Sequence, residues 1–250
     1  MQETTGPKAL TEYLLKITKN KENKPYLKLI IQGILAGSYI AIGAIGYFKL
    51  AGSIADPGLA AFFAALVFPL GIIAVLQMQA ELFTSNCLIM TALYAGKTKV
   101  YNILRILAMV LLANLIGSVF ISYLTNVSGI FNEQTMGLVF EKAISKAHMP
   151  FDKLIFSSIL CNIIVCTGMC MAYNTKNESA KIIVLWLAIT VFVLSGTEHV
   201  VANMYYLFTA YFAGADITLL EIIYNLVISG LGNFIGGGLI IAGANYIIAK

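Results

Sequence analysis

Two long apolar stretches of this chain, residues 59–95 and 182–212, are each interrupted by a short polar patch. The patches read ELFTS at residues 81–85 and SGTEH at residues 195–199. An unbroken helix over 59–95 would be about 55 Å long, whereas the hydrocarbon core of a bilayer is about 30 Å thick. We therefore expect both stretches to break at their polar patches. An ionisable group at such a depth costs about 2.5–3.5 kcal/mol on insertion scales, so it usually lines a cavity or a transport path.

The composition places the chain in the membrane. Of its 250 residues, 59% are hydrophobic and only 11% are charged, and the mean hydropathy is +0.85. This balance predicts an all-α, polytopic membrane protein in which no separate catalytic domain is available. The net charge of +4 is scattered along the chain, so nucleic-acid binding has no support. The cysteines form no metal-ligand cluster, and we expect neither a metal site nor a cofactor.

The order of apolar segments predicts six transmembrane helices in one membrane domain, residues 1–250. Residues 1–26 have apolar side chains at helical spacing, which predicts an amphipathic N-terminal helix on the membrane face. Residues 27–124 form a first repeat of three spans, 125–152 an outer loop, and 153–250 a second repeat. The second span of each repeat, spans 2 and 5 of the chain, is the broken one. Because each repeat has an odd number of spans, the two must insert in opposite senses, as inverted repeats do in many transporters.

The distribution of lysine and arginine predicts the orientation. If both termini are cytoplasmic, twelve of these residues lie on the inner side and four on the outer side. The outer four are Lys49, Lys142, Lys146 and Lys153. This bias follows the positive-inside rule and predicts a multi-pass protein with both termini in the cytoplasm.

The polar residues at the breaks are the candidate site. His199 can act as a proton donor or as a hydrogen-bond donor to a permeating species. A lone histidine on an apolar helix face is more often a packing residue, but the position after Glu198 at a predicted break favours function. Thr84 can bind a passing group or cap the restarting helix. Glu81 and Glu198 can bind a cation or accept N–H bonds at the breaks.

Two broken helices in opposite orientation aim two N-terminal ends at one cavity. Oriented N–H groups at such ends favour negative charge. The physical interpretation is therefore a path for a small anion. Asn233, which precedes a run of glycines, could reach the same cavity or bridge two helices.

Three motifs resemble those of the formate/nitrite transporter family. Residues 80–85, AELFTS, are similar to the family's A-[DE]-L-F-T-S loop. Residues 195–204, SGTEHVVANM, are similar to its S-G-x-E-H-x-[IV]-A-N-M signature, and residues 232–238, GNFIGGG, to its G-N-x-[IV]-G-G-G motif. The resemblance covers essentially the whole chain, and the three motifs occur in order on the predicted spans.

The resemblance implies an aquaporin-like fold, a homopentamer with one pore per subunit, and passage of monovalent anions of weak acids such as formate, nitrite and hydrosulfide. It implies no enzyme activity and a place in the bacterial inner membrane. Two departures, the polar segment 76–79 and a loop that keeps only His148 of the expected histidines, point to the hydrosulfide-channel branch.

The resemblance also implies roles for individual residues. Thr84, His199 and Asn233 fall on the family's central pore positions, and Lys146 falls on its outer-vestibule lysine. Apolar narrowings are expected at four residues: Phe68, Phe192, Ile72 and Leu82. Glu198 lies on the same path. Lys16 is a candidate gate at the inner mouth, unless its helix only binds lipid headgroups.

These residues suggest a mechanism with one open alternative. Lys146 would attract the anion electrostatically, and Thr84, Asn233 and His199 would replace part of its hydration between apolar collars. His199 would also pass it a proton. The alternative is a proton- or cation-coupled secondary carrier for the same anions, with Glu81 and Glu198 as cation ligands. A water channel is disfavoured because the paired Asn-Pro-Ala loops are absent.

Overall fold

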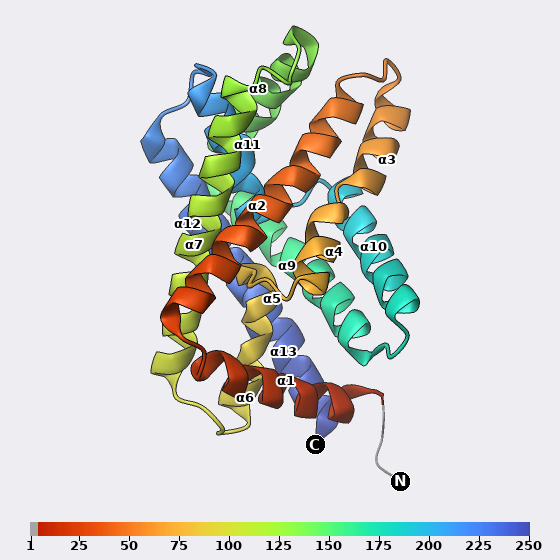
Figure 1. Cartoon of the computed structure of the whole chain (residues 1–250), viewed down its shortest axis with the longest axis vertical. Helices are drawn as coiled ribbons and strands as arrows, with labels where there is room; N and C mark the ends of the chain where they lie inside the picture. The colour runs from red at the N-terminus through yellow and green to blue at the C-terminus, as the bar shows by residue number, and fades with distance from the viewer. Residues whose placement is uncertain (1–4) are drawn as a thin grey trace.

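The computed structural model describes residues 5–250, and Figure 1 shows them as a bundle of helices. Helix α1 (Pro7–Glu22) lies across one end of the bundle, and α8 (Glu133–Ala147) lies at the opposite end. The last helix, α13 (Ala242–Ala249), ends beside α1. We call the two ends of the molecule the α1 side and the α8 side. Within residues 5–250 there are no strands.

The first half of the chain crosses the molecule three times, and its second crossing is broken. Its helices are α2 (Tyr26–Ala51), α3 (Pro57–Val67), α4 (Leu70–Gln77), α5 (Phe83–Asn86), η1 (Cys87–Ile89), α6 (Met90–Tyr94) and α7 (Val100–Val127).

The second half repeats this order. Its helices are α9 (Phe151–Asn174), α10 (Glu178–Leu194), α11 (Val200–Phe212), α12 (Leu219–Phe234), the π-helical turn η2 (Ile235–Ile241) and α13. The third crossing of this half is α12, η2 and α13 together, which run without a break from Leu219 to Ala249.

The predicted breaks occur where expected. Helix α4 ends at Gln77 and α5 begins at Phe83, and α10 ends at Leu194 and α11 begins at Val200. A further interruption separates α3 from α4 at Phe68 and Pro69, because Pro69 has no N–H to continue the helical ladder.

The segment between the halves differs from the expectation of an outer loop over 125–152. Helix α7 continues to Val127, and residues 133–147 form α8. The side chain of Asn132 caps α8 by accepting a bond from the Thr135 N–H, and the helix buries Val139 and Ala143 on one face. A short amphipathic helix therefore precedes the first span of each half: α1 before α2, and α8 before α9.

Glycines allow the long helices to pack with their backbones in close contact. A Cβ atom built on Gly37 of α2 would lie 2.1 Å from the backbone oxygen of Asn114 in α7. A Cβ built on Gly236 would lie 2.2 Å from the backbone oxygen of Ile159 in α9. Close backbone approach of this kind is the usual way in which helices associate in lipid.

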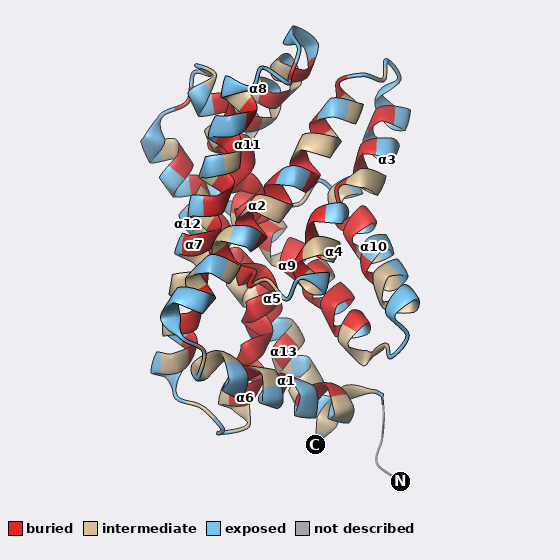
Figure 2. Cartoon of the chain, in the orientation of Figure 1, coloured by how far each residue is buried: buried red, intermediate tan, exposed pale blue. Residues whose placement is uncertain are grey.

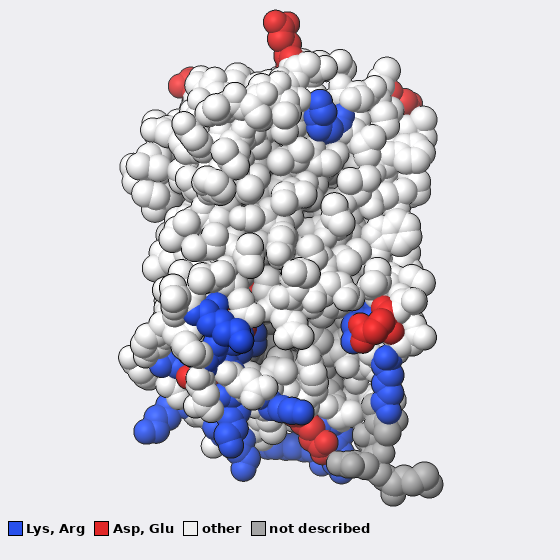
Figure 3. Space-filling model, viewed as in Figure 1, with Lys and Arg blue, Asp and Glu red and all other residues white. Residues whose placement is uncertain are grey.

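The surface agrees with a membrane location. Among residues 5–250, five helical segments are long and apolar enough to cross a bilayer, and α10 with α11 make up the broken sixth crossing. Figure 2 shows the buried residues concentrated around the central α5, with exposed residues on the outside. Figure 3 shows a middle zone almost free of charge and a gathering of Lys and Arg toward the α1 side.

The contact at Gly37 yields a stability prediction. Gly37→Val should lower the thermal stability of the detergent-solubilised protein strongly, because the new side chain meets backbone that cannot move aside. Heating followed by size-exclusion chromatography measures this. Gly137→Ala in α8 is the control. A Cβ at this position meets nothing within 4 Å, and the substitution replaces a glycine in a helix interior, so it should not lower the stability. Equal stability of Gly37→Val and the wild type would contradict the packing argument.

Candidate functional site

The two breaks meet at the centre of the molecule. The hydroxyl Oγ1 of Thr84, in the first turn of α5, lies 2.9 Å from Nε2 of His199, the residue that precedes α11. Both side chains are almost fully buried. The structure therefore brings together two residues that are 115 positions apart and that the sequence predicts on one path.

The hydrogen bonds of His199 define its tautomer. Its Nδ1 accepts a bond from the backbone N–H of Ala202 at 3.2 Å, so His199 caps α11. In the neutral imidazole the proton then belongs to Nε2, which faces Thr84. Protonating Nδ1 would set two donors against each other beside the positive end of α11.

A buried asparagine from α7 holds the first break. The Oδ1 atom of Asn114 accepts the N–H of Phe83, the first residue of α5, at 2.9 Å. Its Nδ2 donates to the carbonyl oxygens of Gly33 and Glu81 at 2.8 and 2.9 Å. Two of these three bonds go to the break itself, at Phe83 and Glu81, and compensate for backbone groups freed where the helix stops.

Asn233 of α12 holds the second break in the same way. Its Oδ1 accepts the N–H of Val200 at 2.8 Å, and its Nδ2 donates to the carbonyl oxygens of Ser158 and Glu198 at 2.8 and 2.9 Å. Of the two sequence-based alternatives for Asn233, the structure shows the bridge between helices. Both of its N–H donors are engaged with backbone, so a donor contact from Asn233 to a passing anion would require one of these bonds to be released.

A further asparagine ties the two halves together. Asn162 of α9 donates to the carbonyl oxygens of Thr84 and Asn233, at 3.2 and 2.6 Å. One side chain therefore links the backbone at the first break to the backbone of α12 at the residue that holds the second break.

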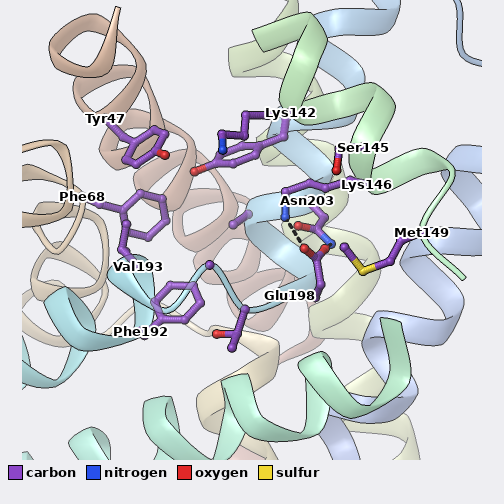
Figure 4. A pocket seen from close by; sticks show the side chains of 14 residues that line it. Tyr47, Phe68, Lys142, Ser145, Lys146, Met149, Phe192, Val193, Glu198 and Asn203 are labelled. Carbon is purple, nitrogen blue, oxygen red and sulfur yellow. Dashed lines mark hydrogen bonds and ion pairs between the residues drawn. The ribbon is translucent and has the colours of Figure 1, made fainter. Parts of the chain in front are cut away.

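On the α8 side, a cavity of about 160 Å³ leads toward the centre (Figure 4). Phe68 and Phe192 line it, and their ring centroids are 6.0 Å apart in an edge-on contact. The ring of Phe192 is also 5.5 Å from that of His199. Two of the four predicted apolar positions thus line this cavity, and one of them, Phe192, also contacts the histidine.

The other two predicted apolar positions, Ile72 and Leu82, are buried, and neither lines this cavity or the larger one on the α1 side. Leu82 directly precedes α5.

Lys146 and Glu198 form an ion pair at the α8-side cavity. The ammonium of Lys146 donates to Oε1 of Glu198 at 2.6 Å, and Oε2 accepts a bond from Asn203 at 2.7 Å. The Lys146 ammonium also lies 5.4 Å from the centre of the Tyr206 ring. The positive charge of Lys146, which the sequence assigns to anion attraction, is therefore balanced by a glutamate with its own place on the predicted path.

On the α1 side, a cavity of about 730 Å³ reaches Glu81. The carboxylate of Glu81 pairs with Lys21 and Lys24 and accepts a bond from Asn86 at 2.9 Å. Burial lowers the pKa of Lys21, while the nearby carboxylate of Glu81 acts in the opposite direction.

Lys16, the candidate gate, is exposed on α1 and does not line this cavity. Lys21 lies about 140° around the helix from Lys16, at 100° per residue, and it is Lys21 that pairs with Glu81 at the break.

The two breaks share a glutamate–asparagine pair, and the asparagine of each pair was not among the residues predicted from the sequence. Glu81 and Asn86 stand five residues apart, as do Glu198 and Asn203, and in each pair the asparagine donates to the glutamate. The repeated five-residue spacing is visible in the sequence and could have identified both asparagines. Asn114, by contrast, lies within an otherwise apolar helix, and no local pattern marks it.

Comparison with known proteins agrees with this architecture. The sequence model described as "Formate/nitrite transporter" matches residues 8–247. The chain belongs to the formate/nitrite transporter family. It is 33% identical to the formate channel FocA of Haemophilus influenzae, over 94% of this chain and 91% of that protein.

Solved structures of the family have the same fold. One described as an FNT family ion channel superposes with a TM-score of 0.87 at 29% identity, covering 98% of each chain. Another, a pentameric formate channel with formate bound, has a TM-score of 0.82 at 29% identity and covers 89% of this chain and 97% of that one. The predicted all-α membrane fold is confirmed, and so is the expectation that the chain is a transport protein rather than an enzyme.

The bonds of Asn233 yield a prediction. Asn233→Asp should lower thermal stability and abolish anion flux, because a carboxylate cannot donate to the carbonyls of Ser158 and Glu198 and is buried beside them. We expect the free energy of unfolding to fall by about 2–5 kcal/mol, because two buried acceptors are left without donors.

The control is Asn177→Asp, at the start of α10. The side chain of Asn177 accepts a bond from Ala180 N–H, a role that Asp fulfils equally well, so stability should be unchanged. If both variants unfold at the same temperature as the wild type, the proposed role of the Asn233 donors is wrong.

Proposed function

We propose that this chain is a channel for small monovalent anions of weak acids, with formate, nitrite and hydrosulfide as candidates. The observation that carries the proposal is the buried Thr84–His199 pair at the meeting point of two broken helices. The formate channels among its relatives support the same class of substrate.

Several features of the centre favour an anion over a cation. Helices α5 and α11 both begin there, and the N-terminal ends of helices attract negative charge. The Thr84 hydroxyl accepts the Nε2–H of His199 and so offers its own O–H as a donor. Both glutamates already pair with lysines, Glu81 with two of them and Glu198 with one, so neither is a free cation site. The alternative, a cation-coupled carrier that uses these glutamates, is therefore less well supported.

The apolar surroundings favour small anions that are weakly hydrated or that can be protonated. Phe192, on which Phe68 packs, lies against both the α8-side cavity and His199, and a fully hydrated ion loses its water at such an apolar position at a high free-energy cost. The Thr84 hydroxyl, whose oxygen accepts the Nε2–H of His199, donates to the ion and replaces part of that water.

His199 is assigned here as a neutral hydrogen-bond donor to Thr84, whose hydroxyl then donates to the anion. The bond from Ala202 N–H to Nδ1 supports this role, since it holds the proton on Nε2. The finer mechanism, in which His199 protonates the passing anion, would require the imidazole to regain its proton after each passage. Substitutions at His199 distinguish the two roles.

We also infer a homopentamer in a bacterial inner membrane, with both termini and the α1 side in the cytoplasm. A pentameric relative supports the assembly. The gathering of Lys and Arg toward the α1 side supports the orientation, because cytoplasmic ends carry the excess of these residues (Figure 3).

The function is tested by anion flux into proteoliposomes. Formate, nitrite and hydrosulfide should enter down their gradients faster than in protein-free vesicles, while sulfate, a divalent anion, should not. Hydrosulfide leading the three would assign the chain to the hydrosulfide branch. Uphill uptake driven by an imposed proton or sodium gradient would favour the carrier instead, and no flux of any of the three would contradict the proposal.

The role of His199 is tested with two substitutions. Asn can accept the Ala202 N–H and still present an N–H, whereas Phe can do neither. His199→Asn should retain flux within about ten-fold of the wild type, with a parallel pH profile, since a single hydrogen bond contributes about 1 kcal/mol. His199→Phe should abolish flux. Equal loss in both variants, with the pH dependence removed, would instead establish proton transfer by the imidazole.

A further inference from the structure

The α8-side cavity contains more positive charge than its ion pair cancels. Three charged residues line it: Lys142, Lys146 and Glu198. Lys146 and Glu198 neutralise each other at 2.6 Å. Within residues 5–250, Lys142 takes part in no ion pair. One positive charge at this entrance is therefore available to a ligand.

The position of Lys142 makes it the first cation that an ion would meet. It stands four residues before Lys146 on α8, and residues with this spacing share a helix face. In Figure 4 its side chain extends from α8 toward Tyr47, away from the Lys146–Glu198 pair. Lys142 is half-buried, so its ammonium keeps contact with water and can exchange a bound anion. A channel needs such reversible binding, because an ion that binds too tightly does not leave.

Tyr47 supplies a donor opposite this lysine. Its ring is fixed by stacking on Tyr206, with centroids 6.2 Å apart, and by an edge-on contact with Phe68 at 6.5 Å. In Figure 4 its hydroxyl lies on the side that faces Lys142. Among the hydrogen bonds of the described residues, the Tyr47 hydroxyl has no protein partner, so its O–H is free to donate into the cavity.

We propose that Lys142 and the hydroxyl of Tyr47 form an anion-capture subsite at the α8-side entrance, and that it takes small monovalent anions before they reach Phe192. Lys146 has a different task there, which is to neutralise the buried Glu198. The inference rests on the proposed anion-channel function. The electrostatic attraction, which the family resemblance implies for Lys146, is thereby assigned to a residue one helical turn away.

The test uses the full-length protein in two preparations of sealed vesicles, one with the α8 side outward and one with the α1 side outward. Formate is the probe, at low ionic strength. Lys142→Gln should raise the half-saturating formate concentration about three- to ten-fold when formate is presented on the α8 side, with the maximal rate retained. Presentation on the α1 side should give wild-type values. Physiological salt should shrink the difference, because the Debye length falls to about 8 Å.

Two variants control for charge and for folding. Lys153→Gln removes the same charge from the same side of the molecule at an exposed position outside the cavity, and should behave as the wild type. Lys142→Arg should restore the wild-type half-saturation. Tyr47→Phe keeps the ring packing and removes only the hydroxyl, and should raise the half-saturation about two- to five-fold.

The outcomes separate this inference from the function on which it rests. Unchanged half-saturation in Lys142→Gln, in vesicles where the wild type conducts formate, would overturn the subsite. An equal effect of Lys153→Gln would also overturn it, because surface charge alone would then explain the result. Absence of formate flux in the wild type would overturn the proposed function instead.

Discussion

The architecture of this protein depends on satisfying backbone hydrogen bonds where two helices stop inside a membrane. Lipid offers no partners for the N–H and C=O groups that a break frees, and each one left unsatisfied costs several kcal/mol. Asn114 and Asn233 solve this problem identically, each with one accepted and two donated bonds. Because both amides are fixed at three points, the residues between them are held in a single geometry, and Thr84 and His199 can meet at 2.9 Å.

The same plan extends to charge. Each break carries a buried glutamate, and each glutamate is neutralised by lysine from the amphipathic helix that precedes that half, or from just beyond its end: Lys21 and Lys24 for Glu81, and Lys146 for Glu198. A buried carboxylate without such a partner would be strongly destabilising. Helices α1 and α8 are therefore parts of the repeats in a physical sense, since they close the ion pairs that make the breaks tolerable. They also bring cations to both entrances of the predicted path.

Local sequence patterns predicted the breaks but not what stabilises them. Segment length against bilayer thickness and the polar residues at 81–85 and 195–199 are local properties, so the broken spans could be inferred directly. The partner of Glu81 could not be inferred in this way, because amphipathic spacing gives the presence of α1 but not its rotation, and Lys16 proved to be on the exposed face. Asn114 and Asn233 are single polar residues whose function depends on contacts more than 30 residues away. The helix α8 was missed because its apolar stripe is short and lies between polar turns.

A comparison of the two repeats also shows why the centre has one polar pair. In the equivalent segments 81–86 and 198–203, the glutamate and the asparagine are retained, while the residues between them differ. Thr84 is the fourth residue of its segment and His199 is the second of the other. The equivalent second and fourth positions hold Leu82 and Val201, both fully buried. A chain with both pairs polar would offer two sites and hold more water at its narrowest point. With one polar and one apolar pair, the proposed path has side-chain donors only at the Thr84–His199 pair, so an anion would lose part of its hydration there without being held tightly enough to stop.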